Sequence, residues 1–219
     1  MNTTEHNTLQ DALRAKQGGW EAKATEAQKT MTADNLDAII ATHFKDNAIN
    51  VGDKAIDFSL KNALGACTNL QDTLSKGPVI LTWYRGGWCP YCNLTLQFLQ
   101  KSLPEFEKYG AKLLALTPEL PDKSLSTSEK HHLKFEVLSD VGNKVAKQYG
   151  LSFKLTDALA EVYKNGVGLQ NYNGDDSSEL PITTTYVIDK NGVVQYAFLD
   201  ADYRKRASIT DIIAVLKTL

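Results

Sequence analysis

Residues 78–100 read PVILTWYRGGWCPYCNLTLQFLQ. Residues 78–84 are an apolar run with the length of a buried β-strand, and residues 90–100 carry leucine and phenylalanine side chains in a helical pattern. A strand therefore leads into a helix through residues 85–89. This unit places the tetrapeptide CPYC, residues 89–92, at the N-terminus of the helix.

The same alternation of short apolar runs and helical patterns continues downstream of the tetrapeptide. We expect further strands over residues 111–117 and 135–138, with helices over 126–133 and 140–150. The resulting order, β-α-β-α-β-α, predicts a layered α/β domain.

The carboxyl-terminal part predicts two antiparallel strands covered by a helix. Residues 183–189 and 193–199 are rich in β-formers and flank Asn191-Gly192, which is a strong hairpin signal. Ser208 then begins a terminal helix. The polar stretch 164–179, rich in Gly, Asn and Asp, is predicted to be a surface loop or an insertion.

The first 48 residues have a different composition, polar and rich in Ala, Lys, Glu, Gln and Thr. Their loosely spaced apolar residues predict two helices, interrupted near Gly18-Gly19, with the second beginning at Asp34. We therefore divide the chain into a helical N-terminal extension, residues 1–48, and a domain over residues 49–219. The extension is interpreted as a packing arm or a homodimer contact without chemistry.

The composition excludes several classes of function. The 219 residues carry 24 Lys+Arg and 26 Asp+Glu, a net charge of −2, which argues against a nucleic-acid clamp. No run approaches the roughly 18–20 apolar residues of a membrane span, and residues 1–6 do not resemble a secretory signal. We expect a cytoplasmic protein, in which a close pair among its 3 cysteines is reactive or metal-binding rather than structural.

The CPYC tetrapeptide is the candidate reactive centre. Cys89 and Cys92 are neighbours on one helical turn, near enough to form a disulfide, and Pro90 suits the first helical position. Backbone N–H groups at the helix start favour a thiolate at Cys89. We predict that Cys89 attacks and that Cys92, one turn further in and less exposed, is its partner.

A zinc half-site is the alternative interpretation of a C-x-x-C pair, and it requires two more ligands. The remaining candidates show no metal-binding spacing: Cys67, His6, His43, His131 and His132. We therefore expect neither a metal nor an organic cofactor. Cys67 is interpreted as an incidental side chain in a hairpin or strand edge rather than as a third redox thiol.

Three residues around the pair are candidate substrate-binding residues. Arg85 either projects toward the strand end, where it would stabilise a thiolate and orient a peroxide oxygen, or lies on the surface. Trp88 and Tyr91 are expected to form apolar walls of the site.

Three segments together resemble a known family. They are VGDKAIDFSL at residues 51–60, WYRGGWCPYCN at residues 83–93 and DADYRKR at residues 200–206. They resemble the redoxin branch of the thioredoxin superfamily, specifically peroxiredoxin-like AhpC/TSA proteins with a C-x-x-C, from Val51 to the end of the chain. The resemblance implies a thioredoxin-like fold, with a central mixed sheet flanked by helices.

The family register changes the expected roles of the site residues. It places Arg85 at the proline and Cys92 at the peroxide-reactive cysteine of typical peroxiredoxins, so the order of the two cysteines stays open. Thr183 falls where thioredoxins carry a proline beside the site. Typical peroxiredoxins also carry an arginine near that strand; residues 181–186 contain none, so Arg85 would have to supply the charge.

The resemblance implies a thiol peroxidase that reduces hydrogen peroxide and organic hydroperoxides. Its cycle would run through a sulfenic acid and a Cys89–Cys92 disulfide, reduced by a thioredoxin- or glutaredoxin-type donor. The alternative is a thiol-disulfide oxidoreductase acting on protein or glutathione disulfides, which the glutaredoxin-like CPYC favours. A third hypothesis is a redox-sensing binding protein whose partner surface is formed by residues 1–48.

Overall fold

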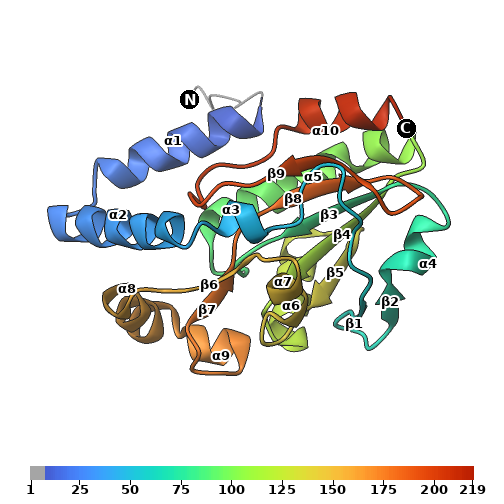
Figure 1. Cartoon of the computed structure of the whole chain (residues 1–219). Coiled ribbons are helices and arrows are strands. Elements are labelled where there is room, and N and C mark those ends of the chain that lie inside the picture. The colour runs from blue at the N-terminus through green and yellow to red at the C-terminus, as the bar shows by residue number, and fades with distance from the viewer. Residues whose placement is uncertain (1–7) are drawn as a thin grey trace.

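The computed structural model describes residues 8–219, which form a central sheet with helices on both faces (Figure 1). The helical segments are α1 (Leu9–Glu21), α2 (Glu26–Ala41), α3 (Phe44–Asn47), α4 (Leu70–Leu74), α5 (Pro90–Glu107), α6 (Pro121–His131), α7 (Lys144–Gln148), α8 (Asp157–Val162), the π-helix η1 (Tyr163–Val167), α9 (Leu169–Asn173) and α10 (Ile209–Leu216). The strands are β1 (Ser59–Lys61), β2 (Cys67–Asn69), β3 (Val79–Trp83), β4 (Lys112–Thr117), β5 (Glu136–Ser139), β6 (Ser152–Lys154), β7 (Glu179–Pro181), β8 (Thr185–Ile188) and β9 (Val194–Phe198).

The main sheet has the strand order β5-β4-β3-β8-β9 and is mixed, as predicted. β3 pairs in parallel with β4, and β4 with β5, whereas β8 and β9 are antiparallel. Asp189 and Gly192 form the turn between β8 and β9, and Gly192 takes a φ of 78°. The hairpin predicted from Asn191-Gly192 is therefore confirmed.

Both faces of the central strands are buried. Val79, Leu81 and Trp83 belong to a hydrophobic cluster that includes residues of α3, α4 and α7. Ile80 and Tyr84 belong to a second cluster that includes residues of α1, α5 and α10 (Figure 1). Burial on both faces explains the nearly continuous apolar sequence of β3. It also leaves the end of β3, where the CPYC helix begins, between the two helical layers.

The amino-terminal helices differ from the prediction in their boundaries. α1 runs through Gly18-Gly19, so the predicted interruption there is wrong. Glycine inside an exposed helix costs only about 1 kcal/mol relative to alanine, and packing of Leu9 and Leu13 offsets this cost. The second helix begins at Glu26 rather than Asp34, because Thr25 and Gln28 form a reciprocal capping box there.

The stretch 164–179 contains two helical segments, so of the two predicted alternatives the loop is wrong. The π-helix η1 follows α8 directly, and Gly168 separates η1 from α9 in a left-handed conformation with a φ of 72°. Leu169 then packs with Leu159 and Leu180 in a third hydrophobic cluster. Because the stretch is mostly polar, its composition did not indicate that Leu169 would pack in a hydrophobic cluster.

None of the helices within residues 8–219 combines the length and the apolar character needed to cross a bilayer.

Candidate active site

The turn between β3 and α5 places Cys89 at the N-cap position of the helix. Cys89 has extended backbone angles, and Pro90 occupies the first helical position as expected. The Cys89 N–H donates to the Gly86 carbonyl at 3.1 Å, and Asn93 Nδ2 donates to the Gly87 carbonyl at 2.8 Å. These two hydrogen bonds connect the β3–α5 loop to the start of helix α5.

Two glycines allow this turn to pass close to its neighbours. A Cβ at Gly86, whose φ is 151°, would lie 2.3 Å from Trp88 Nε1. A Cβ at Gly87 would lie 2.0 Å from Thr127 Oγ1 on α6. Both distances are far inside van der Waals contact, so neither position has room for a side chain.

We expect Gly87→Ala to lower the free energy of unfolding by about 1–3 kcal/mol, because the new methyl group forces Thr127 and α6 away from the turn. Urea unfolding followed by circular dichroism measures this change. Gly19→Ala is the control, since a Cβ there meets no described atom within 4 Å. It should raise stability by up to about 1 kcal/mol. Equal effects of the two substitutions would contradict the crowded turn.

The two cysteines are free thiols whose pKa values are shifted in opposite directions. Burial alone would raise the pKa of Cys89, but a hydrogen bond from the Cys92 thiol and the charges of Arg85 and Arg206 lower it to about 5. Burial, the hydrogen bond with Cys89 and the Cys89 charge raise the pKa of Cys92 well above its usual value. These shifts favour a thiolate at Cys89 and a protonated thiol at Cys92 near neutral pH.

The expected difference in exposure is wrong. Cys89 is 1% exposed and Cys92 is 0% exposed, because the loop after β9 and the surrounding aromatic rings cover the start of α5. The local charges, and not accessibility, distinguish the two thiols.

Arg85 is buried at 2% exposure, so the surface alternative is wrong for this residue. Its Cζ atom lies 4.2 Å from the ring centroid of Tyr203, 4.9 Å from that of Trp88 and 5.1 Å from that of Tyr163. Its Nη2 donates to the Tyr163 hydroxyl at 2.8 Å. A cation that is enclosed by aromatic rings and that lowers the pKa of Cys89 suits a developing negative charge.

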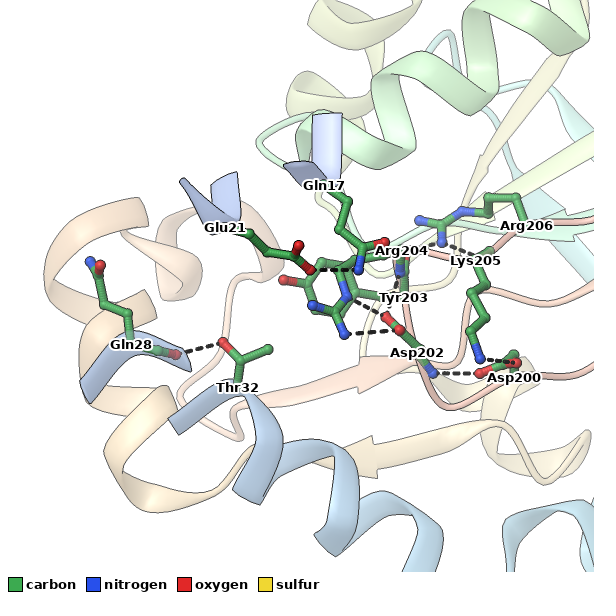
Figure 2. A network of polar contacts seen from close by, with 10 residues as sticks. All are labelled: Gln17, Glu21, Gln28, Thr32, Asp200, Asp202, Tyr203, Arg204, Lys205 and Arg206. Carbon is green, nitrogen blue, oxygen red and sulfur yellow. Dashed lines mark hydrogen bonds and ion pairs between the residues drawn. The ribbon is translucent and has the colours of Figure 1, made fainter. Parts of the chain in front are cut away.

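A second arginine reaches the site from the loop after β9. Arg206 Nη2 donates to Cys92 Sγ at 3.5 Å, and the guanidinium also donates to the carbonyls of Tyr203 and Lys205. Figure 2 shows that ion pairs stabilise this loop: Arg204 binds Asp202 through two hydrogen bonds, and Lys205 pairs with Asp200. The site therefore holds two arginines, so Arg85 does not have to supply its positive charge alone.

The other predicted substrate-binding residues also lie in this region. The Tyr91 and Tyr203 rings pack edge to face with centroids 5.6 Å apart, and Trp88 packs edge to face on Tyr163 at 5.3 Å. Thr183 is buried just before β8, and the next residue, Thr184, accepts a hydrogen bond from the Trp83 N–H at the end of β3. Thr183 Oγ1 has no hydrogen-bond partner among the described residues.

A buried carboxyl group supports the turn from the side of β4. Glu119 is fully buried, and its Oε1 accepts from the Gly87 N–H at 2.9 Å. Burial raises the pKa of Glu119 to about 7, although the Gly87 hydrogen bond opposes the shift. Protonation of this carboxyl near neutral pH would weaken its hydrogen bond with the Gly87 N–H.

The candidate metal ligands do not converge. Cys67 is exposed on β2, as expected for a strand edge, while His43 and His132 occupy left-handed positions at helix ends. Within residues 8–219 no group of three or more His, Cys, Asp or Glu side chains is placed to hold a metal ion. His6 lies outside the described residues.

Sequence reasoning missed four residues of the site. Tyr203 and Arg206 belong to the DADYRKR segment, whose family resemblance was a usable signal. Glu119 and Tyr163 lie in stretches assigned to a loop or left without chemistry. No local pattern marks them, because their roles depend on contacts across the fold.

Comparison with known proteins finds relatives that cover most of this chain. Peroxiredoxin Q of Oryza sativa subsp. japonica, a chloroplastic protein, is 26% identical over 171 residues, covering 78% of this chain and 68% of its own. Peroxiredoxin Q of Sedum lineare, also chloroplastic, is 27% identical over 162 residues, covering 74% of this chain and 75% of its own.

Solved structures show the same fold. Peroxidoxin BcpB from Mycobacterium tuberculosis superposes with a TM-score of 0.62 at 22% identity, over 78% of this chain and 98% of its own. Peroxiredoxin Q from Xanthomonas campestris superposes with a TM-score of 0.56 at 19% identity, over 74% and 90%. The AhpC/TSA family model matches residues 51–197, from the first of the three resembling segments into β9. Because this match spans more than half of the chain, it shows that the chain belongs to the AhpC/TSA family.

Proposed function

We propose that the chain is a thiol peroxidase in which Cys89 attacks the peroxide and Cys92 resolves the oxidised product. Family membership and the peroxiredoxin Q relatives support peroxidase function. The observation that carries the assignment of the cysteines is the low pKa of Cys89, about 5, next to a Cys92 thiol whose pKa is raised. At neutral pH the thiolate, which is the reactive form, therefore resides on Cys89.

The chemical steps follow from this charge distribution. The Cys89 thiolate attacks the terminal oxygen of ROOH, the O–O bond breaks, and the leaving RO⁻ takes up a proton to give ROH and a Cys89 sulfenic acid. The positive charge of Arg85, which favours the Cys89 thiolate, would also stabilise the negative charge that develops during this step. Cys92 then loses its proton and attacks the Cys89 sulfur; the S–O bond breaks, and hydroxide leaves as water after gaining a proton. A thioredoxin- or glutaredoxin-type dithiol reduces the disulfide.

Thiol-disulfide exchange at the same pair is the second candidate function. A Cys89 thiolate at a helix N-terminus also attacks disulfides, and CPYC is a suitable sequence for this reaction. Family membership and the peroxiredoxin Q relatives favour peroxide over a disulfide as the substrate, so peroxide stands first. The cytoplasmic location and the homodimer contact stay predictions.

Stopped-flow tryptophan fluorescence of the reduced protein mixed with hydrogen peroxide tests the peroxidase directly, because Trp88 adjoins the pair. We expect oxidation far faster than that of a free thiol such as glutathione. Trp88→Phe should remove most of the signal while peroxide consumption continues, which links the signal to the site. Oxidation no faster than the free thiol, with disulfide reduction retained, would reject the peroxidase in favour of the exchange reaction.

The pH dependence of the reaction gives a separate prediction. Because the pKa of Cys89 is lowered to about 5, thiolate absorbance at 240 nm should rise with a midpoint near pH 5 and be nearly complete at pH 7. The rate of oxidation by peroxide should follow the same curve, falling as the pH drops through 5. A midpoint near pH 8–9, the ordinary range of a cysteine, would contradict the proposed electrostatics.

A further inference from the structure

Tyr163, the first residue of η1, contacts the reactive turn although no chemical step uses it. Its hydroxyl accepts the hydrogen bond from Arg85 Nη2 at 2.8 Å, and its ring lies 5.1 Å from the Arg85 Cζ atom. The same ring packs edge to face on Trp88. Tyr163 therefore touches two residues of the turn that carries Cys89.

We propose that Tyr163 is a positioning residue of the peroxidase, and that its hydroxyl and ring hold the Arg85 guanidinium beside Cys89. This inference rests on the proposed function and extends it to a segment outside the cysteine helix. It assigns a role to η1, which lies between α8 and α9.

The backbone of η1 fixes the position of this tyrosine. The Gly168 N–H donates to the Tyr163 carbonyl at 2.9 Å, which closes the wide i→i+5 turn of a π-helix. Gly168 adopts a φ of 72°, a left-handed angle that favours glycine. π-turns of this kind occur frequently at functional sites.

Arg85 requires such support because it is a long side chain on a glycine-rich turn. The Tyr203 ring lies nearer than the others, at 4.2 Å, but no described hydroxyl other than that of Tyr163 accepts a hydrogen bond from Arg85. Arg85 Nε is buried without a hydrogen-bond partner in the described part of the chain. Loss of the Tyr163 hydroxyl would leave a second buried donor of the same guanidinium unpaired, so the guanidinium would move.

The thiolate of Cys89 is sensitive to such a movement. The titratable and charged groups that act on Cys89 come from the turn, from α5 and from the loop after β9: Arg85, Tyr91, Cys92, Tyr203 and Arg206. Arg85 and Arg206 are the cations of this set. Weakening one of the two therefore changes the ionisation of Cys89.

The test is the thiolate titration at 240 nm in Tyr163→Phe, which keeps the ring and removes the hydroxyl. We expect the midpoint to move upward from about pH 5. Oxidation by hydrogen peroxide should slow about threefold or more at pH 5 and stay within about twofold at pH 8, where the thiolate is already formed. Tyr172→Phe is the matched control on α9, whose ring has Lys123 as its cationic neighbour, and it should leave both measurements unchanged.

A double variant shows whether the effect passes through Arg85. In the Arg85→Met background, Tyr163→Phe should produce no further shift of the midpoint. An unchanged midpoint in a well-folded Tyr163→Phe, or an equal shift with and without Arg85, would overturn the proposal. The titration uses no peroxide, so it separates a failure of this proposal from a failure of the peroxidase assignment.

Discussion

Cys89→Ser is expected to abolish the reaction with hydrogen peroxide, lowering its rate constant on the order of 10³-fold or more. A serine hydroxyl is not ionised near neutral pH, and the Arg85 and Arg206 charges that lower the pKa of Cys89 to about 5 cannot activate it. Peroxide consumption with dithiothreitol as the reductant measures the loss.

Cys92→Ser provides the matched control for this prediction. It removes the neighbouring thiol but keeps the attacking sulfur, so the first oxidation should proceed and stop at a Cys89 sulfenic acid, which dimedone traps for mass spectrometry. The reverse result, with Cys92→Ser inactive and Cys89→Ser still forming a sulfenic acid, would establish the order implied by the family register. It would contradict the assignment of the attacking thiolate to Cys89.

Local signals in the sequence were sufficient for the fold and for part of the site. The apolar run of β3, the Pro90 start of α5 and the Asn191-Gly192 hairpin are properties of short segments, and each is confirmed. Glycines were the less reliable signal. Gly18-Gly19 does not end α1, because whether a glycine ends a helix depends on the packing and capping around it.

Local sequence predicted a thiolate at Cys89 from its place at the helix start, but not the full set of groups that lowers its pKa. The low pKa of Cys89 depends on Arg206 in a loop more than a hundred positions away along the chain. The burial of Arg85 depends on Tyr163 in η1 and on Tyr203 in the loop after β9, two segments far from it along the chain. The CPYC spacing identifies the reactive pair, and contacts across the tertiary structure determine which of the two cysteines has the lower pKa.

Arg85→Met should raise the pKa of Cys89 above about 5 and slow its oxidation by peroxide about tenfold or more at pH 6. A positive charge close to a thiolate favours the ionised form, so its removal returns the thiol toward its ordinary pKa. The sign of the effect is therefore a loss that is largest at low pH and that diminishes as the pH rises through the new midpoint. Rates measured from pH 5 to 8, with the 240 nm titration alongside, test this.

Methionine is suited to this test because it fills the aromatic enclosure without a charge. Removal of one charge would leave the buried Cys89 thiolate uncompensated, but this thiol can take up a proton and become neutral, so the fold should persist. Arg14→Met is the control: Arg14 is an exposed arginine on α1 paired with Asp11, and its removal should leave the titration unchanged. If Arg85→Met slowed oxidation equally at every pH, Arg85 would act on the bound peroxide alone. The enclosed guanidinium would then not be what keeps Cys89 ionised.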